Sequence, residues 1–358
     1  MEGMKILDRY IGQVVTQTVL AVVLVLVVLL TMIGFANEVD KIGHANYTFE
    51  VAAIYTLLYL PMQIYQLFPL SALLGTMMGL GLLASHGELV VVRASGVSVV
   101  RIIGSVMKAM SLLIVLVIFI GEMVAPPAYQ YAVHARVKAM AGKISLNTDY
   151  GLWARDGGMF IHVRRVENDG RLIDIRLYDF DKDIQKMNFV LSAESGVFDG
   201  QQWLLSKVRK GLIEKDRLVL KAFPELKWQT LLDPDLINIV SVKPDELSSL
   251  KLWNYIQYLK DNDLEYAQYE LAFYNRLLMP LSIIAMVLIA VPFVFVSPRH
   301  SSIGQKIVIG FLIGIIFYIA NRLIGQMGLV YNFPPILAAA LPTLLVIGIA
   351  GLLLRRLR

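Results

Sequence analysis

The chain has 358 residues, of which 57% are hydrophobic and 17% charged, and its mean hydropathy is +0.63. Soluble proteins are about 45–50% apolar and about 25% charged, so an ordinary soluble enzyme, a disordered chain and a fibrous repeat are excluded. The absence of cysteine excludes disulfides, Cys-ligated metals and thiol chemistry. The net charge of +5 could suggest nucleic acid, but in a membrane protein it mostly reflects cytoplasmic loops. The composition predicts a membrane protein that binds no nucleic acid.

Six apolar stretches are long enough to cross a hydrocarbon core of ~30 Å, which takes about 20 helical residues. They are predicted at about 11–35, 52–84, 102–124, 277–296, 307–324 and 333–354. The second contains Pro61 and Pro69, so we expect a long, kinked helix. Pro126 and Pro127 are expected to end the third.

Basic residues near the span ends predict the orientation. They gather at the N-terminus, in the second and fourth connections and at the C-terminus: Lys5, Arg9, Arg93, Arg101, Lys108, Arg299, Lys306, Arg355, Arg356 and Arg358. With six spans, these four sites fall on one side. Both termini are therefore predicted to be cytoplasmic, and the interval between the third and fourth spans to lie outside.

That interval, about 130–276, has a different composition, because charged residues are common and apolar ones alternate. Segments 159–167 and 171–180, joined by Asn168-Asp169-Gly170, predict a β-hairpin. Further strands are predicted at 188–193, 202–208, 217–223 and 225–231, with a turn at Pro224. From Pro244 the spacing predicts an amphipathic helix, and a second one that runs into the fourth span.

Many short strands separated by turns predict a sandwich or jelly roll. The predicted fold is a membrane α-helical protein with six transmembrane helices and an inserted, periplasmic, all-β, jelly-roll-like domain. Its parts are residues 1–129 with spans one to three, 130–276 with the β-domain and its amphipathic helices, and 277–358 with spans four to six.

Motifs for enzyme chemistry are missing from the sequence. No P-loop, His-Glu-x-x-His motif or Gly-x-Ser-x-Gly elbow occurs. Glu122, Arg276 and Arg322 lie near predicted span ends rather than deep inside, which disfavours an ion-coupled transporter. The chain is therefore predicted to be non-catalytic, with no metal or cofactor of its own, so that another protein must supply the energy for any transport.

The most informative short segment is 85–101, between the second and third spans. Ser85 and Glu88 fit a capping box, which predicts a short helix that starts here and ends near Gly96. In one interpretation, Glu88 only caps this helix. In the other, the helix inserts into a groove on a partner protein and Glu88 pairs with a basic residue there. The exposed apolar residues from Leu89 onward fit such a groove, and they also fit the bilayer surface.

Several segments together resemble the LptF/LptG permease family of the lipopolysaccharide export ABC transporter, and within it the LptG type. The resemblance covers nearly the whole chain. It is carried by LDRYIG (7–12), FPLSALLG (68–75), GELVV (87–91) with ASG (94–96), GE (121–122) before AP (125–126), GLWA (151–154) and PP (334–335).

The resemblance implies an inner-membrane subunit of a Gram-negative bacterium that extracts lipopolysaccharide and passes it to a periplasmic β-jelly-roll bridge. The implied partners are a sister permease of LptF type, a single-span LptC-type subunit and a cytoplasmic ATPase dimer, which binds the ATP and Mg. The short helix, about 85–97, is implied to be the coupling helix that contacts the ATPase. Its candidate contact residues are Ser85, Glu88, Leu89 and Arg93.

The implied lipid cavity lies between the two permeases and needs a basic rim for lipid A phosphates and an apolar wall for acyl chains. Lys41, Arg136 and, more weakly, His134 are the rim candidates, and a solvated or snorkelling cation is the alternative. The family often carries a Lys in the last turn of span one, where this chain has Gly34.

The wall candidates are Phe68, Ile313, Phe317 and Tyr318, for which ordinary helix or lipid contact is the alternative. In the β-domain, Phe160, Ile161, Leu177 and Trp203 fill a core or line an acyl groove. Two other functions remain open. A mechanotransmission or lipoprotein-release permease would usually have four spans, and a membrane-tethered periplasmic sensor should carry a cytoplasmic output domain.

Overall fold

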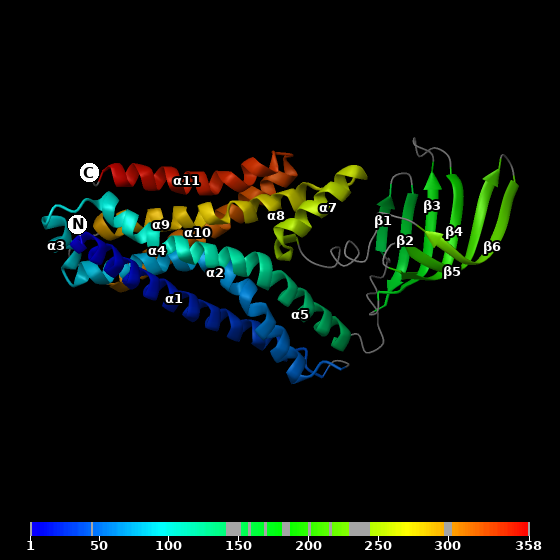
Figure 1. Ribbon diagram of the computed structural model, residues 1–358, viewed down its shortest axis with the longest axis horizontal. Helices are drawn as coiled ribbons and strands as arrows, with labels where there is room; N and C mark the ends of the chain where they lie inside the picture. The colour runs from blue at the N-terminus through cyan, green and yellow to red at the C-terminus, as the bar shows by residue number, and fades with distance from the viewer. Residues whose placement is uncertain are drawn as a thin grey trace.

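The computed structural model describes residues 2–43, 46–140, 152–156, 159–167, 170–180, 187–199, 202–214, 217–228, 244–296 and 303–356. Figure 1 shows a long bundle of helices with a β-sheet beyond one of its ends. Both termini lie at the other end of the bundle, beside the short helix α3. We call these the sheet end and the terminal end.

The bundle is built from helices that follow the apolar stretches of the sequence. They are α1 (Glu2–Val39), α2 (Phe49–Ser85), α3 (Glu88–Ala94), α4 (Val99–Phe119), a π-helix η1 (Ile120–Val124), α5 (Ala125–Met140), α8 (Ala267–Leu277), α9 (Met279–Val296), α10 (Ile303–Val330) and α11 (Pro335–Arg355). In the described part of the chain, five helices are long and apolar enough to cross a membrane, or six if α8 and α9, bent by 51°, form one span. The predicted membrane-helical fold is confirmed.

The third span does not end at Pro126 and Pro127, contrary to the prediction. Helix α4 passes into η1, and α5 then continues from Ala125 with both prolines in its first turn. Proline is tolerated there because the first amides of a helix have no intrahelical partner. The π-helix resets the hydrogen-bond register just before the prolines. The result is a continuous 38-residue helical segment, Val99–Arg136.

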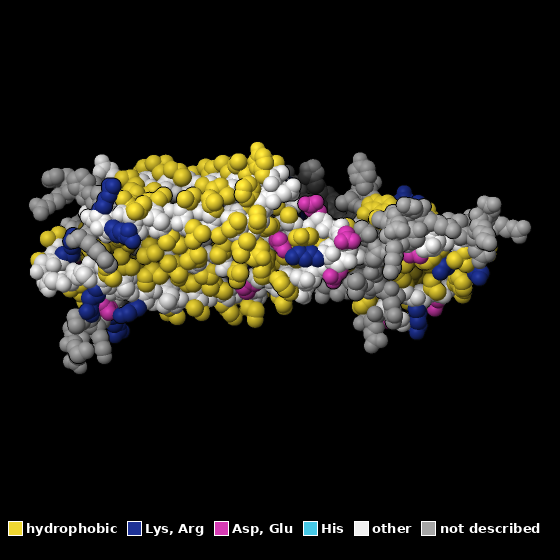
Figure 2. Space-filling view, turned by 90° about the horizontal axis from the view of Figure 1, so that it is seen from above, with side chains coloured by type: hydrophobic (Ala, Val, Ile, Leu, Met, Phe, Trp, Pro, Cys, Tyr) yellow, Lys and Arg dark blue, Asp and Glu magenta, His cyan; other side chains and the backbone are white. Residues whose placement is uncertain are grey.

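The core of the bundle is apolar and close-packed. Helices α1, α2, α4 and α9 contribute most of its fully buried side chains. On α2, a Cβ atom at Gly75 would overlap the Val19 backbone of α1, so glycine lets these two helices approach closely. Figure 2 shows a broad hydrophobic band over the viewed face of the bundle, with Lys and Arg gathered at the terminal end. This is the surface expected of a bundle surrounded by lipid.

The inserted domain is a six-stranded antiparallel sheet whose strands follow the chain order. The strands are β1 (Leu152–Asp156), β2 (Met159–Val166), β3 (Leu172–Phe180), β4 (Met187–Phe198), β5 (Trp203–Glu214) and β6 (Arg217–Trp228). The predicted hairpin is present as β2 and β3, with Gly170 at φ +82° in the turn. The predicted turn at Pro224 is wrong. Pro224 lies within β6, which is an edge strand of the described sheet next to β5, and an edge strand tolerates a residue without an amide proton.

The sheet has its own core on one face. Ile161, Leu177 and Trp203 are each about 1% exposed and belong to this core, whereas Phe160 packs edge-on against Phe180. Trp203 pairs across β5 and β6 with Trp228. In the structure, three of the four candidates from the sequence therefore fill a core.

The chain returns to the bundle through a 3-10 turn η2 (Pro244–Glu246) and α7 (Ser249–Asp261). The Ser248 hydroxyl caps α7 by accepting from the Lys251 amide. The predicted amphipathic helix is confirmed, because Leu252, Tyr255 and Ile256 are buried along one face. Figure 1 shows α7 beside α8 at the sheet end.

Candidate functional site

The short helix α3 forms as predicted but begins differently. Its N-cap is Gly87 in the left-handed conformation (φ +78°), and no side chain caps it. The Ser85 hydroxyl donates to the Leu82 carbonyl within α2. The predicted capping box is therefore wrong, because α2 continues through Ser85 and a glycine makes the turn between the helices. The predicted end near Gly96 is correct, since Gly96 has φ +86°.

One face of α3 is anchored and the other is open. Leu89 is 3% exposed and packs into the bundle core, and the Arg93 guanidinium lies 5.7 Å from the Phe295 ring centroid. Val90 and Val91 are 63% and 68% exposed. Two valines at the end of a bundle form an apolar surface that the described chain does not cover, as expected of a helix that seats in a groove.

Glu88 lies at the first position of α3, and its side chain is 37% exposed. Its carboxylate accepts a hydrogen bond from Tyr10 of α1 and lies 3.8 Å from His86 Nδ1. These contacts orient the carboxylate without burying it. Because it is not used as a side-chain cap, Glu88 remains available to a cation on a partner.

The two rim candidates Lys41 and Arg136 meet at one carboxylate. Lys41 Nζ lies 2.7 Å from Glu38 Oε1, and Arg136 Nε lies 3.3 Å from Glu38 Oε2. The Tyr47 hydroxyl donates to Glu38 Oε2 at 2.7 Å. We call Glu38, Lys41, Tyr47 and Arg136 the Glu38 cluster. It joins the end of α1, the α1–α2 connection and α5, and it carries a formal charge of +1.

The cluster has two buried members, Glu38 and Tyr47, which are 6% and 1% exposed as residues. Burial and the adjacent carboxylate raise the pKa of Tyr47, so Tyr47 stays a proton donor. Lys41 and Arg136 remain 37% and 28% exposed at their side chains, so each keeps part of its donor capacity for an outside anion. Arg136 also lies over the Tyr55 ring, with Cζ 4.9 Å from the centroid. His134 is exposed on α5 outside the cluster.

The four wall candidates are not equivalent. Phe68 is 2% exposed in the bundle core, and Ile313 and Phe317 pack partly against that core. Tyr318 is 63% exposed on α10. Of the four, Tyr318 therefore presents the largest share of its side chain to the outside.

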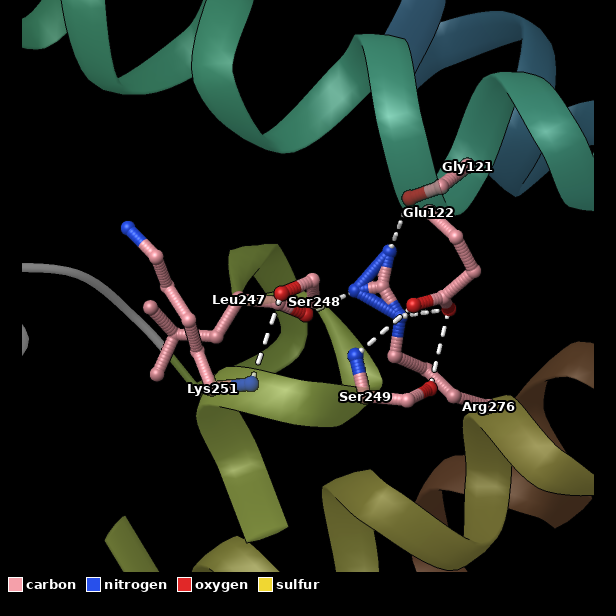
Figure 3. A network of polar contacts seen from close by, with 7 residues as sticks. All are labelled: Gly121, Glu122, Leu247, Ser248, Ser249, Lys251 and Arg276. Atoms are coloured by element: carbon pink, nitrogen blue, oxygen red, sulfur yellow. Dashed lines mark hydrogen bonds and ion pairs between the residues drawn. The ribbon is translucent and has the colours of Figure 1, made fainter. Parts of the chain in front are cut away.

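A second polar site at the sheet end was not identified from the sequence (Figure 3). Arg276 at the end of α8 is 7% exposed, and its Nε lies 3.2 Å from Glu122 Oε1. Its Nη2 donates to the Gly121 carbonyl at 2.7 Å, and its Nη1 donates to the Leu247 carbonyl. Glu122 Oε2 accepts from the Ser249 amide at 2.8 Å, and Oε1 accepts from the Ser249 hydroxyl at 2.9 Å. We call these five residues the Arg276 network.

The network joins three segments that are far apart in sequence: the π-helix η1, the start of α7 and the end of α8. Glu122 lies at the N-terminus of α7, where a carboxylate stabilises the free amides and the helix dipole. The Arg276 guanidinium also lies 5.0 Å from the Tyr65 ring centroid of α2. A Cβ atom at Gly121 would overlap that ring, so glycine is required there. The network fixes the segment that returns from the sheet against the third span.

Glu122 and Arg276 are 154 residues apart, so no local pattern links them. A signal was nevertheless present. Opposite charges at the ends of two apolar spans are expected to pair when buried. Among the described residues, no group of three or more His, Asp or Glu side chains could hold a metal ion.

Comparison with known proteins identifies the family to which the chain belongs. The family described as lipopolysaccharide export system permease LptF/LptG matches residues 9–356. The lipopolysaccharide export system permease protein LptG of Escherichia coli (strain K12) is 36% identical over 346 residues, which is 96% of each chain. The protein of that name from Haemophilus influenzae is 35% identical over 353 residues, 98% of this chain and 99% of that one.

These matches agree with the helical bundle, the inserted sheet and the resemblance expected from the sequence. They also favour the exporter over the lipoprotein-release permease and the sensor. The chain belongs to the LptF/LptG permease family and is a multi-pass inner-membrane permease subunit of the lipopolysaccharide export system.

Proposed function

We propose that the chain is the LptG-type half of an ATP-driven extractor of lipopolysaccharide. It pairs with a sister permease of LptF type and a single-span LptC-type subunit. Lipopolysaccharide leaves the outer leaflet of the inner membrane through a cavity between the permeases, then passes along the sheet to a periplasmic jelly-roll bridge. The chain binds no cofactor, and a cytoplasmic ATPase dimer binds the ATP and Mg.

The observation that supports this proposal best is the separation of the two ends of the bundle. Helix α3, with exposed Val90 and Val91 and the half-exposed Glu88 carboxylate, lies at the terminal end, whereas the sheet lies beyond the other end. An ATPase seated on α3 would therefore act on the bundle from the side opposite the sheet. Its movement would reach the sheet end through the spans, because α1, α2 and the continuous helical segment Val99–Arg136 run from one end to the other.

In this account, Glu88 pairs with a basic residue of the ATPase, and Leu89 and Arg93 hold α3 on the bundle. Lys41 and Arg136 contact the phosphates of lipid A, with His134 as a weaker neighbour. Tyr318 contributes to the cavity wall, with Phe317 and Ile313 behind it. Phe68 supports the wall from the core.

Cysteine labelling tests the proposed orientation in the membrane directly. The chain has no native cysteine, so each introduced cysteine is the only one labelled in it. Single cysteines at Val91 on α3 and Leu220 on β6 are matched, since both side chains are about 70% exposed. In intact spheroplasts, a membrane-impermeant maleimide should label Leu220→Cys and should label Val91→Cys only after lysis. The reverse pattern would contradict the proposed orientation.

Partnership is tested by co-purification. Co-expressed with an LptF-type permease and the ATPase, the tagged chain should be isolated with both in one complex. Isolation of a stable lone chain from such cells would contradict the proposed assembly.

A further inference from the structure

Arg322 lies farther inside its helix than the sequence predicted. Helix α10 continues to Val330, so eight residues, or about 12 Å, separate Arg322 from that end. Sixteen residues, or about 24 Å, separate it from Lys306, whereas the hydrocarbon core is ~30 Å thick. At least one of these cations therefore lies inside the hydrocarbon layer. Lys306 is 8% exposed and shielded by protein, but Arg322 is exposed.

Arg322 also lacks a counter-charge among the residues that the structure describes. Three described acidic residues of the sheet end have contacts of their own: Glu38 with Lys41 and Arg136, Glu122 with Arg276, and Glu246 with Tyr129. None of the ion pairs between described residues includes Arg322. An arginine keeps its charge under all physiological conditions. An exposed, charged arginine in a span therefore favours an anionic group from outside the chain.

Simple snorkelling is hindered by the direction of the helix. Side chains on a helix lean toward its N-terminus, and α10 begins at the terminal end. The Arg322 side chain therefore leans away from the nearer, sheet-end surface. It covers the preceding turn, where Tyr318 is 63% and Ile319 is 50% exposed.

Tyr318 is part of a row of tyrosines that reaches Arg136. The Tyr318 hydroxyl lies within electrostatic range of Tyr59 of α2, and Tyr59 stacks on Tyr55 with ring centroids 6.3 Å apart. Arg136 lies over the outer ring of this row, Tyr55. The row thus has an arginine near each end. Phenol rings offer flat contact surfaces with polar ends, and two guanidinium groups offer charged donors, which suits a phosphorylated sugar headgroup.

We propose that Arg322 binds a phosphate group of lipopolysaccharide, and that Tyr318 packs beneath the same headgroup. This inference rests on the proposed function and adds a contact to it. Arg136 shares its charge with Glu38, but Arg322 has no such partner among the described residues. Arg322 therefore exerts the stronger net attraction on an anion, and its planar donors can bind a phosphate bidentately.

The test uses the complete complex, with sister permease and ATPase, in lipid nanodiscs and without nucleotide. Binding of fluorescent lipopolysaccharide is measured with its phosphates intact and after enzymatic dephosphorylation. Arg322→Gln should weaken binding of the phosphorylated form by about tenfold and leave the dephosphorylated form unchanged. Arg322→Lys should recover most of the loss. Gln326→Ala, an exposed and neutral site one turn further along α10, is the matched control and should change neither.

An equal loss for both forms, or no loss, would overturn the proposal. So would loss of the sister permease from the Arg322→Gln complex, which would assign Arg322 to a protein contact. Phosphatidylglycerol at the same concentration should not displace the phosphorylated ligand, and displacement would assign the site to ordinary phospholipid. If the unsubstituted complex bound neither form, the proposed function itself would fail.

Discussion

The two ends of the bundle handle charge in opposite ways. At the sheet end, Glu38 and Glu122 are each enclosed by cations and hydroxyl groups of the same chain. At the terminal end, Glu88 keeps a partly exposed carboxylate beside two exposed valines. The two sheet-end carboxylates thus have their partners within the chain, whereas the Glu88 carboxylate keeps part of its surface open. Substitution of an enclosed carboxylate at the sheet end should change stability, and substitution of Glu88 at the terminal end should change coupling.

The Arg276 network should give the largest effect. Glu122→Ala leaves the buried Arg276 guanidinium without its carboxylate, so we expect a loss of about 3–5 kcal/mol of unfolding free energy. Unfolding of the purified chain in detergent, followed by intrinsic fluorescence against denaturant, measures it. A double-mutant cycle with Arg276→Met should yield a coupling energy of roughly 0.5–3 kcal/mol. Strictly additive losses would contradict a direct pair.

The next largest effect is expected at the terminal end, where a substitution should lower ATPase activity and leave the stability of the chain almost unchanged. Glu88→Ala should lower lipopolysaccharide-stimulated ATPase activity of the complex by about tenfold, equivalent to ~1.4 kcal/mol. The reason is that its carboxylate caps no helix and remains 37% exposed at the side chain beside Tyr10 and His86. Ser85→Ala is the matched control and should be neutral, since Ser85 bonds only within α2. Equal loss of stability in both variants would restore the capping interpretation.

Arg136 tests whether a paired residue at the sheet end also serves the lipid. Arg136→Glu places a second carboxylate beside Glu38, so lipopolysaccharide photocrosslinking at position 55 should fall by about fivefold. Arg136→Lys should retain more of the signal, because it keeps the charge. Unchanged crosslinking in Arg136→Glu would remove Arg136 from the rim.

The smallest effect is expected at Lys260, which pairs with Glu270 on the outside of α7 and α8. The hydrogen bond to Glu270 raises the pKa of Lys260. Because the raised value belongs to the folded state, the stabilisation is complete below the ordinary lysine pKa of about 10.4 and is lost as pH rises through the raised value. Lys260→Met should cost at most about 1 kcal/mol at pH 8 by denaturant unfolding.

The pH dependence provides the check. The difference between Lys260→Met and the unsubstituted protein should stay constant from pH 7 to 9 and shrink above that range. Lys227→Met, at an exposed site on β6, is the control. A difference that grows with pH would contradict the pair.

The sequence predicted the membrane helices and the hairpin because both are encoded locally, by apolar length and by a turn motif. It failed where context overrides local propensity. The helix continues through Pro126 and Pro127, which directly follow the π-helix η1. Pro224 lies in a strand, because that strand is at an edge of the described sheet. The predicted capping box at Ser85 is wrong, because Gly87 in the left-handed conformation makes the turn between α2 and α3.

The residues of the candidate site were likewise predictable only in part. Lys41, Arg136 and Glu88 could be named from charge, position and resemblance. Their partners could not, because the carboxylate between Lys41 and Arg136 joins α1 to α5, and Arg276 reaches Glu122 across 154 residues. Long-range pairing of this kind is set by packing of the bundle and not by any local spacing.

Transfer of lipid out of a membrane tests the central claim most directly. The complex of this chain, an LptF-type permease, an LptC-type subunit and the ATPase is reconstituted in liposomes that contain lipopolysaccharide. Release to a soluble jelly-roll acceptor is then followed with and without ATP. The account predicts transfer that requires ATP and this chain and that falls sharply with Glu88→Ala. Transfer that proceeds equally without the chain, or no transfer from an assembled, ATP-hydrolysing complex, would contradict it.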